Sequence, residues 1–201
     1  MAKTKYQKEH GNFSNRAHLT AREKVYPKIF NTNSFRDLIF EKDTLLEDSQ
    51  RGHFLDGEMG VDRVIRVVDS RFKNGLEGIP CYIQERFREP EYFKFQDLTI
   101  TAWNEASNTR SELYKINADY FVYGYYNELN NDFLDVICIN VTLLKEALRR
   151  KTIEFVHDRN PKKQTFVGFQ FTALKRAGVI TYWKNDPAHK QKIKNKEFIA
   201  I

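Results

Sequence analysis

The spacing of apolar residues in the first third of the chain predicts an amphipathic helix over residues 34–52. Apolar side chains recur there at intervals of three and four residues, and most acidic side chains fall off that stripe. Ser34 can cap the first turn, and Gly52 can end the last one. The segment is therefore expected to be an acidic helix with one apolar face.

Three segments that follow have the composition of β-strands. Residues 61–68 are rich in β-branched side chains, residues 79–88 alternate in part, and residues 98–103 are mostly apolar. A turn at Asn74-Gly75 separates the first two segments, so that they can pair as a hairpin.

The pattern changes again after residue 110. Residues 111–116 predict a short helix, and residues 119–126 predict a strand. Residues 133–141 are nearly all apolar, which indicates a strand buried on both faces at the middle of a sheet. Residues 142–151 predict a helix whose basic end suits the negative end of the helix dipole.

The two ends of the chain carry weaker patterns. Residues 1–33 are expected to form a basic arm, extended or partly helical, which either contacts DNA or is a solvated tail. Residues 152–201 are expected to complete the domain and to end in a basic tail. The core over residues 34–151 is thus predicted to be an α/β domain with a central mixed sheet flanked by helices.

The amino-acid composition supports one folded domain, and the net charge favours some classes of binding partner over others. Hydrophobic residues make up 41% and aromatic residues 14% of the 201 residues, which is enough for a hydrophobic core. An excess of 33 Lys and Arg over 27 Asp and Glu gives a formal charge of +6, which favours anionic partners such as nucleic acid or a membrane surface.

The cysteines and the absence of a signal or membrane-spanning pattern indicate the cellular compartment of the protein. Cys81 and Cys138 lie in apolar runs without a CxxC motif, which predicts two buried thiols in a reducing compartment rather than zinc ligands. The sequence has no secretory signal pattern and no run of about 18 apolar residues. A cytoplasmic location is therefore expected.

Polar residues stand at two places where strands normally carry apolar ones. Asp62 opens the strand over residues 61–68 just after a glycine turn, where a carboxylate suits a hard cation. Gln84 and Arg86 project from one face of the next strand, with Glu85 between them. If the two strands pair, this face lies near Asp62 and could hold Mg²⁺ beside a phosphate. The alternatives are a solvent-facing turn at Asp62 and an exposed edge strand whose charges prevent edge-to-edge pairing.

These segments resemble the core of PD-(D/E)XK nucleases over roughly residues 35–150. The family motif is an Asp at the start of one strand and an acidic-x-Lys triplet on the next, often with a helix Glu. Asp62 matches the Asp, and Gln84-Glu85-Arg86 occupies the triplet. Glu47 corresponds to the helix carboxylate, with the alternatives Glu41, Asp43 and Asp48. The passage KINADYFVY is similar to the helix-to-strand passage that follows the active site in phage and mobile-element members.

The resemblance implies a restriction-endonuclease-like fold and an Mg²⁺- or Mn²⁺-dependent deoxyribonuclease. The implied metal ligands are Asp62, Glu47 and Gln84, and Glu85 and Arg86 complete the catalytic set. DNA is the implied partner, a homodimer is allowed, and the implied DNA contacts are Lys115, Arg88, Arg63 and His53.

The triplet departs from the family pattern in its first and last residues. Gln84 is similar to the Gln-x-Lys variant of Mrr-like nucleases, in which an amide oxygen coordinates the metal. Arg86 stays protonated and so cannot act as a base, although it can stabilise charge on phosphorus. Two alternatives are that Glu85 is the ligand on a bulged strand and that Lys115 supplies the missing amine.

Two other functions stay open at this level. The first is a catalytically degraded nuclease fold that binds DNA or regulates. The second is an α/β interaction protein whose polar strand is a solvated edge. Aromatic residues interleaved with basic ones, as in RFR and YFKF, suit stacking on single-stranded or distorted DNA.

Overall fold

The computed structural model describes residues 5–30, 38–43, 60–67, 80–105, 107–159 and 164–186. Within these residues the strands form two sheets. The larger has the order β1-β2-β3-β6-β7-β10, with β1 (Leu38–Asp43), β2 (Arg63–Val67), β3 (Cys81–Arg88), β6 (Tyr120–Asn127), β7 (Asp132–Asn140) and β10 (Ile180–Trp183). The smaller has the order β5-β4-β9-β8, with β5 (Thr109–Arg110), β4 (Asp97–Asn104), β9 (Gln164–Gln170) and β8 (Val156–Arg159).

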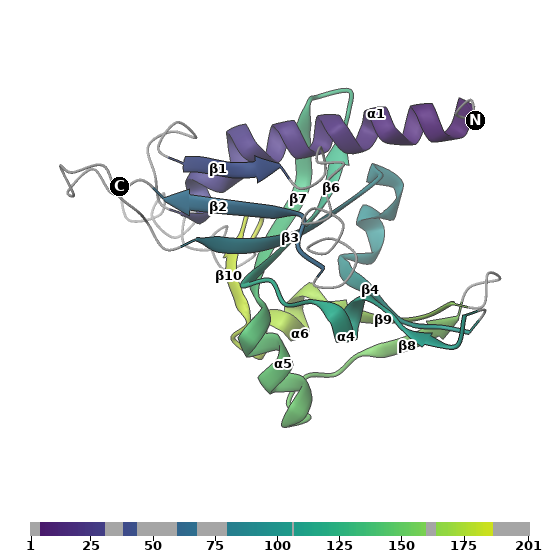
Figure 1. Cartoon of the computed structure of the whole chain (residues 1–201). Coiled ribbons are helices and arrows are strands. Elements are labelled where there is room, and N and C mark those ends of the chain that lie inside the picture. Colours follow the sequence, from purple (N-terminus) through teal and green to yellow (C-terminus); the bar gives the residue numbers. More distant parts are fainter. Residues whose placement is uncertain are drawn as a thin grey trace, which may run out of the picture.

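The larger sheet is mixed and lies between a helical layer and the smaller sheet (Figure 1). Strands β3 and β6 are parallel, whereas every other neighbouring pair in this sheet is antiparallel. Helix α1 (Lys5–Thr20) runs across one face of the sheet (Figure 1). The smaller sheet lies on the other side, together with α4 (Glu112–Lys115), α5 (Val141–Arg149) and α6 (Phe171–Arg176). The prediction of an α/β fold with a mixed central sheet and flanking helices is confirmed at this level.

The N-terminal segment, which was predicted to be an extended or partly helical arm, is helical and packs against the larger sheet as a layer of the fold. After α1 the chain continues as a π-helical turn, η1 (Ala21–Val25), and a short helix, α2 (Tyr26–Ile29). Phe13, Ala17, Ala21 and Val25 recur every four residues, and all four are buried against the larger sheet. Two of the four are alanines, so the apolar stripe is too weak to stand out from the basic residues around it.

The helix predicted over residues 34–52 is wrong where the structure describes it. Residues 38–43 form β1, which pairs antiparallel with β2 from Leu38 opposite Val67 to Asp43 opposite Arg63. Apolar spacing in such a short run fits either a helix or a strand. The backbone N–H and C=O groups along β2 can form hydrogen bonds with an extended neighbouring segment. This tertiary pairing overrides the helical propensity of residues 38–43. The rest of the predicted helix lies outside the described residues.

The elements after residue 80 form close to their predicted positions. Their strands, however, belong to two sheets instead of the single predicted sheet. Strand β3, strands β6 and β7, and helix α5 were each expected within a few residues of their observed bounds. Strand β4, predicted as a third strand of one series, instead pairs with β5 and β9 in the smaller sheet. The C-terminal extension contributes β8 and β9 to the smaller sheet and β10 to the edge of the larger one.

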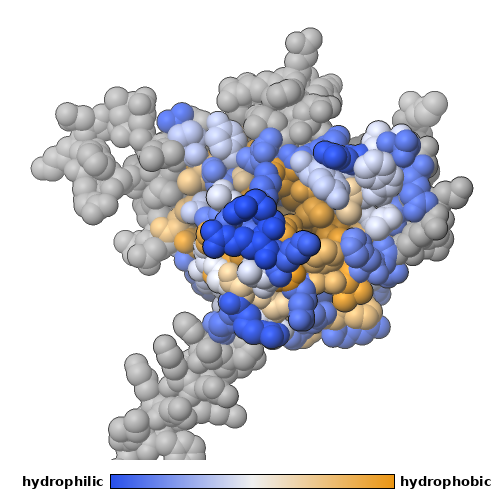
Figure 2. Space-filling model, turned by 90° about the horizontal axis from the view of Figure 1, so that it is seen from below, coloured by the Kyte–Doolittle hydropathy of each residue, from blue (hydrophilic) through white to orange (hydrophobic). Residues whose placement is uncertain are grey.

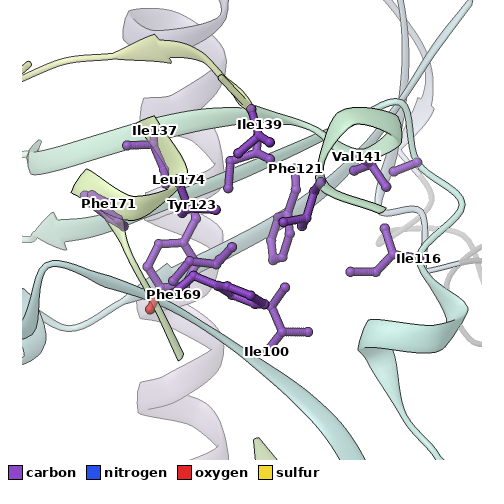
Figure 3. Close-up of a cluster of buried hydrophobic side chains, with 14 of the residues drawn as sticks. Ile100, Ile116, Phe121, Tyr123, Ile137, Ile139, Val141, Phe169, Phe171 and Leu174 are labelled. Atoms are coloured by element: carbon purple, nitrogen blue, oxygen red, sulfur yellow. The ribbon is translucent and has the colours of Figure 1, made fainter. Parts of the chain in front are cut away.

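The main core fills the space between the two sheets (Figure 3). Phe121 and Tyr123 of β6 and Ile137 and Ile139 of β7 point down into it, and Phe169 of β9 meets them from the other sheet. The smaller sheet therefore buries the lower face of the larger one, as α1 buries its upper face. In the part of the chain described here, no helix is long and apolar enough to cross a membrane.

Both cysteines are free thiols, and the prediction that both are buried is confirmed for Cys138 and wrong for Cys81. Burial raises the pKa of the Cys138 thiol to about 12, and burial together with Asp119 raises the pKa of Cys81. Cys138 is fully buried in β7, whereas Cys81 is partly exposed at the start of β3.

We expect one thiol per native chain, that of Cys81, to react with a disulfide reagent at pH 8, because the reaction needs an accessible thiolate. The second thiol should react only after unfolding in denaturant. Absorbance titration counts the thiols, and mass spectrometry of peptides identifies the labelled one. Equal labelling rates for both thiols in the native protein would contradict the burial of Cys138.

Candidate active site

The pairing of β2 with β3 brings Asp62 beside the Gln84-Glu85-Arg86 triplet. Arg63 lies opposite Ile83 in the antiparallel register, and the backbone N–H of Asp62 donates to the carbonyl of Ile83 at 2.8 Å. Continued by one residue, this register places Asp62 across from Gln84. The predicted pairing of these two strands is confirmed, and the predicted turn at Asn74-Gly75 lies outside the described residues.

Just before β2 begins, the carboxylate of Asp62 provides a hydrogen-bond acceptor for the backbone of β3. Beyond this point no described strand pairs with β3 on that side, and the backbone N–H of Glu85 instead donates to Oδ2 of Asp62 at 2.6 Å. A buried N–H left without an acceptor is costly, so this hydrogen bond stabilises the end of the hairpin. Asp62 is 6% exposed and is therefore not a solvent-facing turn residue.

Strand β3 divides the polar triplet between the two faces of the sheet. Gln84 and Arg86 face α4 and the smaller sheet, whereas Glu85 faces α1. The β3–β6 register runs from Ile83 to Arg88 without a shift, so the described ladder gives no support to the alternative of a bulge that turns Glu85 around. Because β3 is an interior strand, the alternative of an exposed, charged edge is wrong.

Gln84 presents an unsatisfied oxygen in a buried position. The residue is 8% exposed, and among the described residues its Oε1 has no hydrogen-bond partner. A Cβ built on Gly60 would lie 3.4 Å from this oxygen and 3.4 Å from the Cα of Ile116. The amide oxygen therefore lies next to Gly60, two residues before Asp62. Most buried acceptors in proteins are paired with a donor, an ordered water or an ion, so this oxygen is a candidate ligand.

We expect Gly60→Ala to lower the free energy of unfolding by about 1–2 kcal/mol. Gly60 has φ +58°, a left-handed conformation that is unfavourable for alanine, and the new methyl group would lie 3.4 Å from Gln84 Oε1 and from the Cα of Ile116, at the short end of van der Waals contact. Urea denaturation measures the change. Gly178→Ala is the matched control, because Gly178 also has positive φ, at +72°, but a Cβ there meets nothing within 4 Å. An equal loss in both variants would show that backbone strain alone matters and that the contact with Gln84 does not.

Arg86 is held by two groups from the layer below the sheet. Its Nη1 donates to the carbonyl oxygen of Thr99 at 3.0 Å, and its Nη2 pairs with Oε2 of Glu112. Burial raises the pKa of the Glu112 carboxyl, and the charge of Arg86 opposes this rise. A hydrogen bond from the backbone of Thr101 to the Glu112 carboxyl also opposes the rise in its pKa.

Glu112 was missed by the sequence reasoning, although a signal for it exists. It follows Ser111 at the start of α4, where an acidic residue is usually explained by the helix dipole. Only the packing of α4 against β4 places this carboxylate against Arg86. The face below the sheet thus combines a carboxylate at Asp62, an amide oxygen at Gln84, and the Arg86–Glu112 pair.

Glu85 belongs to a separate buried cluster above the sheet. Its Oε2 accepts a hydrogen bond from Nε of Arg63 at 2.8 Å and also pairs with Nδ1 of His18 from α1. Burial raises the pKa of Glu85, and the hydrogen bond from His18 opposes this rise. His18 was not predicted, because the sequence gave no reason to place the N-terminal segment against β3. The cluster fastens α1 to the sheet.

The residues predicted to contact DNA have different places in the structure. Arg63 is 6% exposed and engaged by Glu85, which does not favour a contact with DNA. Lys115 lies at the partly exposed C-terminal end of α4, and Arg88 lies near the surface with its guanidinium 4.1 Å from the centroid of the Tyr92 ring. Glu47 and His53 lie outside the described residues.

The donor set for a metal ion is sparse in the structure. Among the residues described, no three His, Cys, Asp or Glu side chains come together as a metal-binding group. Asp62 and Gln84 offer oxygen donors, which Mg²⁺ and Mn²⁺ prefer, and the unsatisfied Gln84 Oε1 is compatible with such an ion. Comparisons with protein-family models, curated proteins and solved structures find no match for this chain.

Proposed function

We propose that the protein is a metal-dependent endonuclease that hydrolyses phosphodiester bonds in DNA. The observation that carries this proposal is the buried, unsatisfied Oε1 of Gln84 next to Asp62, on the sheet face that also holds Arg86 and Glu112. Most buried polar groups have a hydrogen-bond partner, and a bound ion is one way to satisfy an oxygen that has none among the protein groups around it.

The order of strands supports the same proposal. The PD-(D/E)XK motif needs an Asp at the start of one strand and a polar triplet on its neighbour. The β2–β3 register brings Asp62 and Gln84 together in this way. The antiparallel series β1, β2 and β3 followed by a parallel β6 also accords with a restriction-endonuclease-like core.

Asp62 and Gln84 would hold a divalent cation, and Glu47 is the predicted further carboxylate. When bound, such a cation polarises the phosphodiester and makes water a stronger acid. Asp62 accepts one backbone hydrogen bond through Oδ2, which fixes the carboxylate in place. Preorganised ligands of this kind do not have to rearrange during the reaction.

Arg86 and Glu112 would divide the roles that a lysine has in the family motif. The Arg86 guanidinium stays protonated and stabilises negative charge on the phosphate oxygens. Burial raises the pKa of Glu112, so its carboxylate is a stronger base than an exposed one and can accept the proton of the attacking water. The water oxygen then bonds to phosphorus, one P–O ester bond breaks, and the leaving oxygen takes up a proton.

The test is incubation of the full chain with supercoiled plasmid in Mg²⁺, in Mn²⁺ and in EDTA. Nicking or linearisation in either metal but not in EDTA is the expected result. If plasmid, single-stranded and junction substrates all stay intact in both metals, catalysis is absent.

We further expect Glu112→Gln to slow nicking by about 10²-fold, within the range for loss of a general base. Glu146→Gln is the matched control, because Glu146 is also a helix carboxylate paired with arginines, Arg149 and Arg150, but lies at the surface of α5. Equal rates in the two variants would remove Glu112 from the mechanism.

The hydrogen bonds of Arg86 favour a second candidate function, DNA binding without cleavage. Both of its terminal nitrogens are engaged, by Thr99 and by Glu112, which suits a structural ion pair. A nuclease fold that binds DNA without cutting it would have this character. Gel-shift binding of DNA by a wild type that cuts none of the substrates would support this function over the first.

A further inference from the structure

A pocket of about 370 Å³ opens next to the proposed active site, between the loop after β3 and the smaller sheet. Its lining comes from β3, the short helix η4 (Pro90–Phe95), β4, β8 and β9. The lining residues are Arg88, Tyr92, Phe95, Asp97, Thr99, Val156, Asp158, Phe166 and Gly168. In Figure 2 apolar side chains gather on the side where the smaller sheet lies in Figure 1, bordered by hydrophilic ones.

The walls of the pocket suit a flat ring. Phe95 is 51% exposed and Val156 is 66% exposed, so apolar surface is available at the rim. Phe166 and Tyr92 add two further rings to the lining. Aromatic walls of this kind stack favourably on any nucleobase. The volume lies at the low end for ligand pockets, which fits one base better than a larger ligand.

The charged side chains of the pocket lining favour a ligand that carries hydrogen-bond donors. Two carboxylates, Asp97 and Asp158, face one guanidinium, that of Arg88. Asp97 is fixed in place, because the Tyr125 hydroxyl donates to its carbonyl oxygen at 2.7 Å and lies 3.2 Å from its Oδ1. An excess of negative charge disfavours a phosphate here. Carboxylates instead accept hydrogen bonds from exocyclic amino groups, such as N4 of cytosine.

Strand β3 links the pocket to the proposed active site, because it carries Arg88 in the pocket lining and Arg86 in the site. Arg86 and Arg88 lie two residues apart on the same face of the strand, about 7 Å along it. Thr99, which lines the pocket, accepts the hydrogen bond from Arg86 through its backbone carbonyl. A DNA strand whose phosphate reached Arg86 would therefore carry a neighbouring base to the pocket.

We propose that this pocket binds one unpaired nucleobase with an exocyclic amino group, cytosine in the first place, from a DNA strand held at Arg86. The inference rests on the proposed function, because it takes DNA as the substrate. It adds a base-binding site and a preference that the motif residues do not supply.

The test compares the affinities of the full chain for 12-nucleotide strands of deoxycytidine and of thymidine, by fluorescence anisotropy in EDTA. We expect the wild type to bind the deoxycytidine strand at least about 5-fold more tightly, since thymine presents a carbonyl oxygen where cytosine has its amino group. Free deoxycytidine monophosphate is the competitor that separates a base within a strand from a free nucleotide. It should compete only at concentrations far above those of the strand.

Three variants remove different properties of the pocket. Phe95→Ala should weaken binding of both strands by about 5-fold or more, through lost stacking. Asp158→Asn should reduce the preference for cytosine, and Gly168→Val should abolish it by filling the floor near Asp97, where a Cβ already comes within 3.4 Å of Oδ2. Leu19→Ala and Glu23→Gln are the controls for Phe95 and Asp158, because both are exposed residues of the N-terminal helical layer on the opposite side of the sheet.

Each outcome decides the assignment. Equal affinity of the wild type for the two strands, or a preference that survives in Gly168→Val, would overturn the base pocket. Tight binding of the free nucleotide would overturn the claim that the base belongs to a strand. Metal-dependent nicking that persists in either case would leave the proposed function standing. Absence of both DNA binding and nicking would overturn the two together.

Discussion

Asp62→Asn is expected to slow metal-dependent nicking by about 10²- to 10³-fold while the protein stays folded. The substitution removes the negative charge that a divalent cation needs, but asparagine keeps an oxygen that can accept the hydrogen bond from the backbone N–H of Glu85. The substitution therefore separates the effect of the negative charge of Asp62 from the effect of its hydrogen bond to the backbone. Nicking rates on supercoiled plasmid and urea denaturation of the same preparation are the two measurements.

The matched control is Asp119→Asn. Asp119 also accepts a hydrogen bond from a backbone N–H of β3, that of Tyr82 at 2.8 Å, but close to the start of the strand and away from Gln84 and Arg86. We expect it to leave the nicking rate unchanged. If Asp62→Asn cuts plasmid as fast as the wild type, Asp62 serves only as a cap for the hairpin. In that case the metal site proposed on it fails.

Arg63→Met is expected to lower the free energy of unfolding by about 3–5 kcal/mol, the largest loss of stability that we predict for this chain. Glu85 has no exposed side-chain surface, and Arg63 and His18 are the groups paired with its Oε2. Removal of the guanidinium leaves a buried carboxylate with less compensation for its lost hydration. The loss should appear as a lower urea midpoint with an unchanged slope.

The double variant Arg63→Met with Glu85→Leu should recover most of this loss, because it removes the buried charge together with its partner. Arg16→Met is the control, since Arg16 also pairs with a glutamate, Glu128, at 3.6 Å, but its side chain is 57% exposed. An exposed pair of this kind contributes about 0–1 kcal/mol. Equal losses in Arg63→Met and Arg16→Met would show that the buried cluster does not fasten α1 to the sheet.

The sequence alone determined the elements whose pattern is strong and local. Alternation and apolar runs located β3, β6 and β7, and helical spacing located α5. It also predicted that Asp62 would meet the triplet, because a hairpin between two adjacent strands needs only a short turn. The shared face of Gln84 and Arg86 follows from the two-residue period of a strand, which is independent of the rest of the fold.

Only the tertiary structure decided how distant segments meet. Residues 38–43 have a pattern that fits a helix, yet the open edge of β2 makes them a strand. His18 reaches Glu85 across 67 residues of sequence, and Glu112 reaches Arg86 across 26. No local period encodes such contacts, since they depend on which layer covers which face of the sheet. The second sheet, and with it the pocket beside Arg88, likewise depends on the pairing of β4 with β9, two strands far apart in the chain.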